Sequence, residues 1–490
     1  MCGIFATKPA IKEWLETSLI KHANRGPDQS AIHIHKDIGL AVNRLAITGS
    51  FDQGSQPIVS KSGNSLCVFN GAIFNYKELS KEFDLNPTSK NDGAVLLELY
   101  EILGVKVFDF VQGMYAIVIV DSEKDALVVS RDPLGIKPLY WITDEDIIVI
   151  SSSLKAIPKA LMKKAEPFPP GLVWTEGELK QAVSPKVEKN ENLDELLTSV
   201  IKDHIPSEVK WGCALSGGVD SSLICALSKK FVHNFNCYVL DTGGEDDFVS
   251  AQTVANYLDL PLKTVKIDKQ TIKEAIPIVV EAIASYNSQT FLGGLGTYLI
   301  SREAKRDGLK VLLSGEGADE MFGGYERYKN LETNDDIEIM MTNDQNNLWL
   351  SHNGRVDHAS MAASIEVRVP FQDLNVLGNA REIPTLAKVN KDLEISDKIC
   401  LREVAYRYLP RSIAERNKVT IASGSGLSKL VKEVLDDFGA PKILKIDMFN
   451  YKIRNVLEAH LFTIWKDLYP ELSTNFKDLA NRNLYSISSN

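Results

Sequence analysis

The second residue of the chain, Cys2, combines two reactive groups if Met1 is removed. Met1 is readily removed when the next residue is small, and Cys2 would then carry a thiol and a free α-amine. An α-amine has a pKa of about 8, so it can accept the thiol proton near neutral pH without a histidine. The first residues therefore offer a cysteine nucleophile with its own base. The alternative is an ordinary second residue that happens to be cysteine.

Polar residues spaced over the first hundred positions could complete a site that cleaves an amino-acid amide. Arg44 could bind an α-carboxylate through its planar guanidinium, and Asp92 could pair with an α-ammonium. The side-chain amide of Asn70 and the backbone N–H of Gly71 are suitable donors to an oxyanion. Taken singly, Asn-Gly is most often a hairpin turn, and the two charges would be surface residues. The combination with Cys2 favours an amidase.

Two glycine-rich turns in the second half each follow a short apolar run. Residues 216–222 read SGGVDSS between the run WGCAL and the helical pattern ICALSKKF. Glycines let the backbone approach a polyanion, and helix N–H groups and serine hydroxyls can then bind it. The turn lacks the lysine and spacing of a Walker loop. A phosphate-binding turn of another type is indicated, and Asp220 within it is a candidate Mg²⁺ ligand.

The second turn carries an unusual density of carboxylates. Residues 314–320 read SGEGADE and are followed by FGGY. Three carboxylates within five residues would repel a phosphate unless a metal ion offset their charge. A bridging Mg²⁺ ion would resolve this conflict. An acidic surface turn is the alternative, but it does not explain the four neighbouring glycines.

The elements that must position these residues differ between the two halves. Residues 66–153 contain short β-branched runs separated by turn residues, which predicts a strand-rich unit. A proline-rich and then charged stretch, residues 163–192, marks a boundary near residue 190. Beyond it, the apolar runs WGCALS, NCYVLD and KVLLSG alternate with helical patterns, which predicts a parallel sheet. From about Tyr325 onward we expect mainly helix. The predicted units are residues 2–190 and 191–490.

Composition excludes several classes of protein. The 490 residues are 44% hydrophobic, enough for two cores, and the formal charge of −10 disfavours a nucleic-acid partner. The apolar runs are too short and interrupted for a membrane span. Six cysteines without a C-x-x-C pair indicate reduced thiols, and we expect a cytoplasmic protein. A homodimer is a candidate assembly that the sequence does not test.

The first half resembles a known family in several motifs. MCGIF, RGPD, NRLAI, SQPI, NGAIFN, QGMYA and RDPLGIKPLYW are similar to the class II glutamine amidotransferase domain. The resemblance implies an N-terminal-nucleophile αββα sandwich in which Cys2 attacks glutamine. It also implies that Arg44, Asn70, Gly71 and Asp92 bind glutamine, with Asn70 and Gly71 forming the oxyanion hole. The chain departs from the family at Ala72 and at Ser152-Ser153, where glutamate is usual after Asn-Gly and after the serine.

The second half resembles the synthetase domain of the glutamine-hydrolysing asparagine synthetase family. LSGGVDSS, SGEGADE, FGGY, SMAASIEVRVPFQD and the later RNK occur in the family's order over residues 193–430. The resemblance implies an α/β ATP pyrophosphatase domain with a parallel sheet and helical additions. It places Mg²⁺ on Asp220 and Asp319 and assigns Glu316 to steering or deprotonating ammonia. The implied ATP and pyrophosphate contacts are Leu215, Ser216, Gly217, Gly218, Asp220, Ser221, Leu240, Ser314, Gly315 and Lys418.

The implied small-molecule substrates are glutamine, ATP and aspartate, but one position departs from the pattern. Leu292 stands where the family usually has the arginine of a Thr-Thr-x-Arg motif near the aspartate. Burying an α-carboxylate without a cation costs several kcal/mol, so another cation must replace the arginine. We expect Arg368 to do so. The alternatives are an amide synthetase acting on another carboxylic acid and a non-catalytic nucleotide-binding protein.

Overall fold

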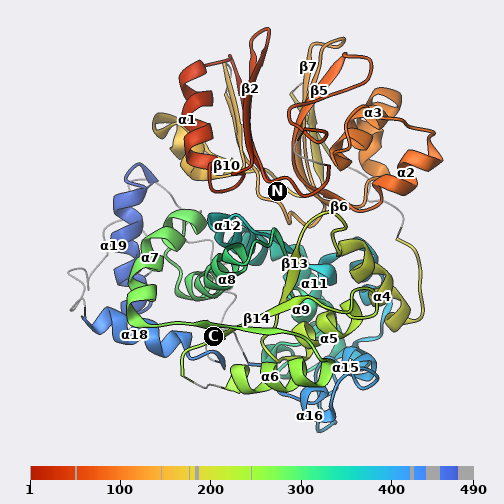
Figure 1. The fold of residues 1–490 in the computed structure, drawn as a ribbon, viewed down its shortest axis with the longest axis vertical. Helices are drawn as coiled ribbons and strands as arrows, with labels where there is room; N and C mark the ends of the chain where they lie inside the picture. Colours follow the sequence, from red (N-terminus) through yellow and green to blue (C-terminus); the bar gives the residue numbers. More distant parts are fainter. Residues whose placement is uncertain are drawn as a thin grey trace.

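The computed structural model describes residues 2–49, 52–144, 146–175, 177–181, 187–243, 246–419, 424–437 and 453–472. These residues form an antiparallel sandwich and a parallel sheet surrounded by helices, packed against each other (Figure 1). Strand β1 (Cys2–Lys8) begins near their junction (Figure 1). Met1 is outside the described residues, so its expected removal stays a prediction. The predicted boundary near residue 190 also stays a prediction, since residues 182–186 are not described.

Two antiparallel sheets face each other in the N-terminal unit. Their strand orders are β10-β8-β9-β1-β3-β2 and β12-β11-β7-β6-β5-β4. The first sheet contains β1 (Cys2–Lys8), β2 (Gln29–His35), β3 (Ile38–Arg44), β8 (Tyr140–Asp144), β9 (Ile147–Ser151) and β10 (Glu166–Pro167). The second contains β4 (Ile58–Val59), β5 (Ser65–Ile73), β6 (Gly113–Asp121), β7 (Ala126–Arg131), β11 (Leu172–Thr175) and β12 (Glu178–Gln181).

Helices cover the outer faces of this sandwich, which confirms the predicted αββα architecture. Helix α1 (Lys12–His22) packs on β1 and β3, and α2 (Tyr76–Glu82) and α3 (Asp92–Leu103) lie on the side of β5 (Figure 1). Successive side chains of β1 point alternately toward the second sheet and toward helix α1, because neighbouring residues of a strand face opposite sides. Ile4 packs between the sheets, whereas Phe5 packs with Leu15 of α1.

The C-terminal unit is built on a five-stranded sheet with the order β15-β14-β13-β16-β17, in which all neighbours are parallel. The strands are β13 (Trp211–Ala214), β14 (Asn236–Asp241), β15 (Leu262–Lys266), β16 (Val311–Leu313) and β17 (Glu366–Arg368). The predicted parallel sheet is confirmed. Strand β17 lies in the region expected to be mainly helical. Its three residues are too few to show a period of two, and Pro370 follows closely.

Helices complete the C-terminal unit, as the helical patterns predict. They are α4 (Leu193–His204), α5 (Val219–Ser228), α6 (Asp246–Leu258), α7 (Lys269–Ile283), α8 (Ser288–Arg306), α9 (Ala318–Phe322), α10 (Glu326–Lys329), α11 (Asn334–Asn346), α12 (Gly354–Ala362), α13 (Leu374–Glu382), α14 (Thr385–Lys388), α15 (Ile399–Ala405), α16 (Arg411–Ala414), α18 (Leu427–Asp437) and α19 (Val456–Leu468). Helices α7, α8 and α12 lie together below the sandwich (Figure 1).

The RGPD motif joins the two units. The Arg25 guanidinium lies 2.7 Å from a carboxylate oxygen of Asp357 on α12, and both side chains are almost fully buried. Asp28 accepts a hydrogen bond from Ala46 and forms an ion pair with Lys310 just before β16. Burying a charge is tolerable only when it is paired. The motif therefore fixes the orientation of the two units rather than contacting a substrate.

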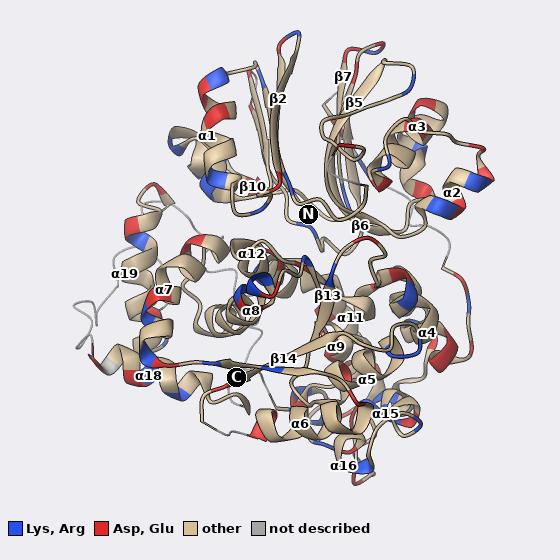
Figure 2. Ribbon diagram, viewed as in Figure 1, with Lys and Arg blue, Asp and Glu red and all other residues tan. Residues whose placement is uncertain are grey.

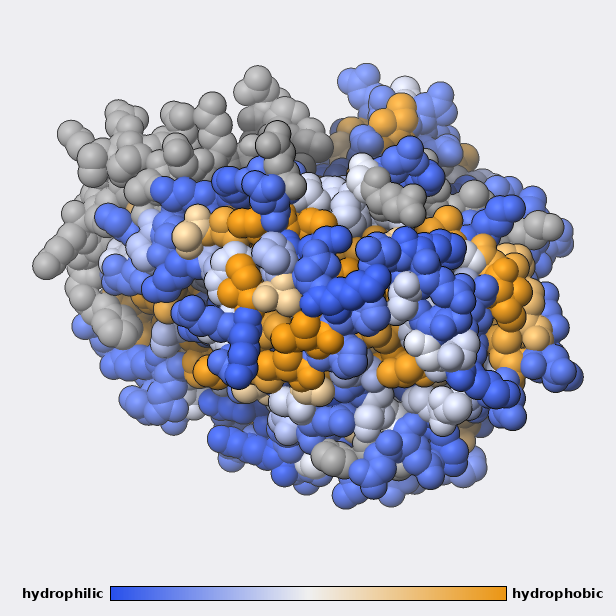
Figure 3. All heavy atoms as spheres, turned by 90° about the horizontal axis from the view of Figure 1, so that it is seen from above, coloured by the Kyte–Doolittle hydropathy of each residue, from blue (hydrophilic) through white to orange (hydrophobic). Residues whose placement is uncertain are grey.

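Charged residues of both signs are intermixed along the helices of both units (Figure 2). The face seen from above carries apolar areas that hydrophilic side chains interrupt (Figure 3). Among the described residues, no helix has the length and hydropathy needed to cross a membrane.

Candidate functional site

A small pocket lies around Cys2 at the junction of the two units. This Cys2 pocket has a volume of about 20 Å³ and is lined by Cys2, Arg44, Leu45, Ile47, Thr48, Gln56, Phe69, Gly71, Asn91, Asp92 and Arg368. Pairing of β1 with β3 places Cys2 directly opposite Arg44. Burial raises the pKa of the Cys2 thiol, although the Leu45 N–H and Arg44 oppose this. A base is therefore needed to generate the thiolate.

Strand β5 supplies the predicted oxyanion donors from the opposite sheet. Asn70 Oδ1 accepts a hydrogen bond of 2.9 Å from the backbone N–H of Cys2. Its Nδ2 is buried and has no hydrogen-bond partner among the described residues. A side chain at Gly71 would lie 2.1 Å from the carbonyl oxygen of Met114, so only glycine fits there. An unpaired amide donor beside a cysteine is the arrangement that an oxyanion requires.

The two predicted glutamine-binding charges also reach this pocket. Arg44 is 1% exposed, and its Nη2 donates to the carbonyl oxygens of Thr48 and Gly49 at 3.1 and 3.0 Å. Asp92 begins α3, and its Oδ2 accepts a 2.6 Å hydrogen bond from Ile73 N–H. Burial raises the pKa of Asp92 to about 6, against the lowering effect of that N–H.

Gln56 also lines this pocket and was not predicted from the sequence. Its Nε2 lies 3.3 Å from Cys2 Sγ and donates to the carbonyl of Phe69, while its Oε1 accepts from Phe69 N–H. Gln56 belongs to the SQPI motif, which carries the resemblance but offers no chemical reason to expect a contact with the thiol. Only the folded loop brings it there.

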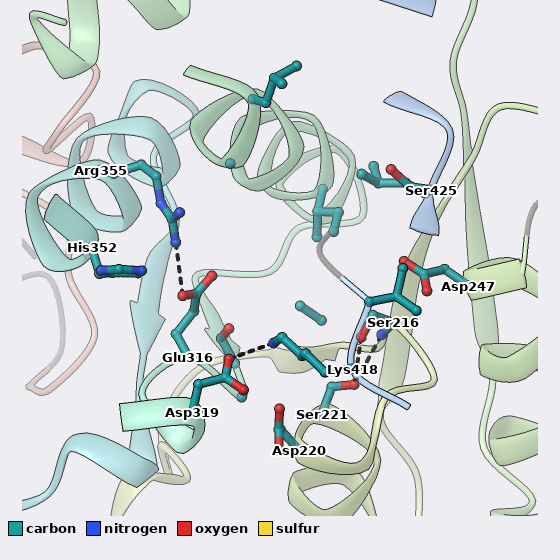
Figure 4. A pocket seen from close by; sticks show the side chains of 18 of the residues that line it. Ser216, Asp220, Ser221, Asp247, Glu316, Asp319, His352, Arg355, Lys418 and Ser425 are labelled. Atoms are coloured by element: carbon teal, nitrogen blue, oxygen red, sulfur yellow. Dashed lines mark hydrogen bonds and ion pairs between the residues drawn. The ribbon is translucent and has the colours of Figure 1, made fainter. Parts of the chain in front are cut away.

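A much larger pocket opens at the carboxyl ends of the parallel strands. This loop pocket has a volume of about 470 Å³ (Figure 4). The predicted residues that line it are Leu215, Ser216, Asp220, Ser221, Leu240, Ser314, Gly315, Glu316, Asp319 and Lys418. Gly217 and Gly218 do not line it but shape its first loop. Strands β13 and β16 are neighbours, so the turns that follow them meet at one edge of the sheet, the usual ligand site of such folds.

The first turn joins β13 to α5 as predicted. Ser216 Oγ lies 3.1 Å from Ser221 Oγ and accepts from Gly218 N–H at 3.4 Å. Gly217 has a φ of +73°, and a side chain there would lie 2.4 Å from Ser250. Arg416 holds the turn from outside by donating to the Ser216 carbonyl and pairing with Asp247 at 2.7 Å.

The second turn packs directly on the first. A side chain at Gly315 would lie 2.8 Å from Ser221 N, and one at Gly324 would lie 2.1 Å from an Asp319 oxygen. Gly315 and Gly324 are thus required because neighbouring atoms approach them closely. An acidic surface turn would not need glycine at these positions. The acidic segment is also buried, since Asp319 is 9% exposed and Glu320 is 1% exposed.

Asp220 and Asp319 converge on one point, as the predicted metal site requires. The Lys398 ammonium lies within 2.6 Å of an oxygen of each, and Lys418 lies 2.6 Å from the other oxygen of Asp319. These lysines hold the pKa of Asp319 well below its usual range despite burial. Two ionised carboxylates are a donor set that Mg²⁺ accepts when nucleotide phosphates supply further oxygens. The residues present therefore fit the metal. Lys398 was not predicted, because nothing in its local sequence marks it.

Glu316 lies on the opposite side of the same pocket, facing α12. Arg355 Nη2 donates to Glu316 Oε2 at 2.9 Å, and His352 lies beside them (Figure 4). Burial would raise the pKa of Glu316, but Arg355, His352 and Lys418 hold it below its usual value. Glu316 is therefore a carboxylate at neutral pH.

The structure contradicts the expected role of Arg368. Its side chain lines the Cys2 pocket, pairs with Glu366 at 2.6 Å and donates to the carbonyl of His204. It does not line the loop pocket. Arg368 is the last residue of β17, and successive residues of a strand point to opposite faces of the sheet. The family-like motif around Arg368 therefore did not indicate which pocket its side chain enters. Arg368 therefore cannot replace the arginine missing at position 292.

Comparisons with known protein families agree with this geometry. A family model described as a glutamine amidotransferase domain matches residues 1–171. One described as asparagine synthase matches residues 192–350 and 330–463, more than half of the chain. The chain belongs to the glutamine-hydrolysing asparagine synthetase family. It is thus a member of a family of carbon–nitrogen ligases.

Curated members of this family match over most of their length. Asparagine synthetase B of Escherichia coli K12 is 32% identical, covering 96% of this chain and 92% of the relative. The Zea mays asparagine synthetase is 28% identical, covering 96% and 87%. Among solved structures, an allosteric regulatory enzyme of purine biosynthesis has a TM-score of 0.32 and 14% identity, covering 54% of this chain and 80% of that one. That likeness is too weak to carry an argument.

The two glutaminase-domain departures from the family pattern are accommodated locally. Ala72 is 5% exposed and packs in the apolar core with Met114. Ser153 is 4% exposed, and its hydroxyl lies 2.9 Å from His22 Nε2. Neither side chain lines the Cys2 pocket. The asparagine synthetase family glutamates at these positions are therefore replaced by residues that pack without a buried charge.

Proposed function

We propose that the protein is a glutamine-dependent asparagine synthetase. It hydrolyses glutamine in the Cys2 pocket, activates aspartate with Mg-ATP in the loop pocket, and joins the released ammonia to the activated acid. The observation that carries the proposal is that one chain holds both sites. One is a buried cysteine beside an unpaired amide donor, and the other is a paired-carboxylate site between two phosphate-type turns.

In the Cys2 pocket, the thiolate of Cys2 attacks the glutamine side-chain amide. Asn70 Nδ2 and Gly71 N–H donate to the oxyanion, and ammonia leaves as the thioester forms. Water then hydrolyses the thioester to glutamate. Arg44 binds the α-carboxylate of glutamine and Asp92 its α-ammonium, so the scissile amide is held next to Cys2. The thiol proton goes to the α-amine of Cys2 once Met1 has been removed.

In the loop pocket, the side-chain carboxylate of aspartate attacks the α-phosphorus of ATP. The product is an acyl-adenylate, and pyrophosphate leaves. Ser216 and Ser314 contact phosphate, Leu215 and Leu240 flank the nucleotide, and Lys418 binds the pyrophosphate. Asp220 and Asp319 are the residues that would hold Mg²⁺, which when bound offsets charge on the departing pyrophosphate. Glu316 orients or deprotonates ammonia for attack on the adenylate, and AMP leaves.

Mass spectrometry of the products from glutamine, ATP, Mg²⁺ and a panel of carboxylic acids tests this proposal. We expect glutamate, AMP, pyrophosphate and asparagine in equal amounts, with aspartate as the preferred acid. A different acid, turned over while aspartate is not, would instead establish the paralogous amide synthetase. Absence of glutamine hydrolysis and of nucleotide turnover would favour a non-catalytic nucleotide-binding protein. A cytoplasmic location belongs to the same proposal.

A further inference from the structure

The loop pocket contains an arginine that has no assigned role in the proposed reaction. Arg355 lies on α12 and lines the pocket together with Leu292 and Gly293 of α8. Its guanidinium points into the pocket toward Glu316 (Figure 4). Leu292 is the position at which an arginine is expected near the aspartate. A second arginine therefore reaches the region from which the first is missing.

Arg355 has spare hydrogen-bonding capacity at the wall of the pocket. Nη2 donates to Glu316, no hydrogen bond of Nη1 is found among the described residues, and the side chain is 13% exposed. An unpaired guanidinium N–H at a pocket wall can be completed by a ligand. A carboxylate is the ligand that a guanidinium binds best, because its two oxygens match the planar donors.

The other cations that line the loop pocket are already engaged. Lys418 lies 2.6 Å from Asp319, on the predicted pyrophosphate side. Arg327 pairs with Asp344 at 2.7 Å and stacks on the ring of Tyr325. Arg355 is paired as well, with Glu316, but among the described cations of the lining it is the one that lies against Gly293, next to Leu292.

Gly293 provides the room that Arg355 needs. A side-chain carbon at position 293 would lie 2.5 Å from Arg355 Nη1 and 2.9 Å from its Cζ. At the next position, Gly294, an added carbon would meet Ile283 and Val279 at 3.4 Å and Arg355 Cγ at 3.6 Å, which are ordinary contacts. Gly293 and not Gly294 is therefore required by the position of the guanidinium.

We infer that Arg355 binds the α-carboxylate of the amino-acid substrate, in place of the arginine missing at Leu292, and that Gly293 makes room for it. This inference rests on the proposed function, because it assumes that the acid adenylated in the loop pocket is an amino acid. The inference means that the α-carboxylate is recognised by Arg355 on α12 and not by a residue at position 292 on α8.

The first test is the aspartate-dependent exchange of pyrophosphate into ATP by the full-length enzyme. In Arg355→Leu we expect the KM for aspartate to rise at least about a hundredfold, while the KM for ATP changes less than about threefold. The KM for aspartate of Arg355→Lys should lie between those of the unmodified enzyme and Arg355→Leu, because an ammonium keeps the charge without the planar donor geometry. Glutamine hydrolysis, which uses the other pocket, reports whether each variant is folded.

The second test uses the neighbouring glycines as a matched pair. Gly293→Ala displaces only the flexible end of Arg355, so the protein should fold while its KM for aspartate rises about tenfold or more. Gly294→Ala should leave that KM within about a factor of three. This pair decides the inference even if Arg355→Leu does not fold.

The third test restores the cation at the position where the family usually has it. Adding Leu292→Arg to Arg355→Leu should recover at least about tenfold of the lost aspartate affinity. An unchanged KM for aspartate in Arg355→Leu, or equal effects of the two glycine variants, would overturn the inference. Absence of aspartate-dependent exchange in the unmodified enzyme would instead overturn the proposed function.

Discussion

The Cys2 pocket and the loop pocket differ in how their charged groups are held. The Cys2 pocket is about 20 Å³ in volume, and backbone groups contact the two charges that we assign to glutamine: Arg44 donates to carbonyl oxygens and Asp92 accepts from an N–H. The loop pocket is about 470 Å³, and side chains from distant elements hold one another, as Lys398 does with Asp220 and Asp319.

This difference is consistent with the substrates that we propose for each pocket. In the Cys2 pocket, a strand framework would position one zwitterion, glutamine. In the loop pocket, ATP would bring a large negative charge, and the lysines there balance the neighbouring carboxylates. We therefore expect changes in one pocket to leave the chemistry of the other largely intact, apart from residues that bridge both.

Cys2→Ala should show the largest separation between the pockets. Removing the nucleophile should lower glutamine hydrolysis at least about a thousandfold, because the remaining groups only bind and polarise the amide. Asparagine formation from free ammonium should persist. Glutamate release and ammonium-dependent amide formation, assayed side by side, check both expectations. Cys67→Ala is the matched control, since Cys67 is buried in the same unit away from the pocket. Loss of both reactions in Cys2→Ala would contradict independent sites.

Asp220→Asn and Asp319→Asn should have the opposite effect: each should impair the chemistry of the loop pocket and spare that of the Cys2 pocket. Each substitution removes one charged oxygen from the pair that would hold Mg²⁺, so pyrophosphate exchange should fall at least about a hundredfold. Glutamine hydrolysis should survive at least in part. Asp259→Asn is a suitable control, because Asp259 lies outside the loop pocket with a φ of +50° that asparagine tolerates. Persistent exchange in both pocket variants would show that the metal is held elsewhere.

Arg368 bridges the two pockets and tests how sharply they are separated. Its side chain lines the Cys2 pocket, while its carbonyl oxygen accepts a 3.0 Å hydrogen bond from Ser314 N–H at the second turn. Arg368→Leu keeps that backbone bond, so the KM for glutamine should rise roughly tenfold and the KM for aspartate should stay within about threefold.

Glu366 would lose its ion pair with Arg368 in this variant, and breaking a buried ion pair costs about 3–5 kcal/mol of folding free energy. The test is therefore best made in Arg368→Leu combined with Glu366→Gln. Steady-state kinetics in glutamine and in aspartate give both KM values. A rise in the KM for aspartate alone would contradict this expectation and support the role predicted from the sequence, in which Arg368 binds aspartate.

The smallest expected effect is a pH dependence confined to the Cys2 pocket. Burial raises the pKa of Asp92 to about 6, and only its carboxylate form attracts the α-ammonium of glutamine. The kcat/KM for glutamine hydrolysis should therefore fall as pH decreases through about 6 in the free enzyme. Asp92→Asn should lower kcat/KM at neutral pH and lose this dependence. An identical pH profile in that variant would assign the titration to another group.

The sequence predicted most of the Cys2 pocket because its residues lie within short motifs on paired strands. Cys2 and Arg44 meet through one antiparallel register, and Asn70 and Gly71 are adjacent on β5. Period-two patterns of β-branched residues predict such strands well. The missing member, Gln56, comes from a loop whose path no pattern encodes.

The loop pocket was predicted only where motifs follow strands. Both phosphate-type turns were found, since a glycine turn after an apolar run is a local signal. Lys398 and Arg355 were missed, and Arg368 was assigned to the wrong pocket. Their roles depend on where the start of α15 lies and on which faces of α12 and β17 meet the turns. An isolated cation carries no sequence signal that distinguishes a surface residue from one in a site.

The sequence by itself determined the two sheet types, the pairing of Cys2 with the neighbouring strand motifs and the positions of the two glycine-rich turns after their strands. Those features depend on local periodicity, on glycines and on residues close together in the chain. Only the tertiary structure decided which cations neutralise Asp220 and Asp319 and which arginine faces Leu292. Ion pairs form between side chains hundreds of residues apart, and their energies depend on distance and burial, which no local pattern specifies.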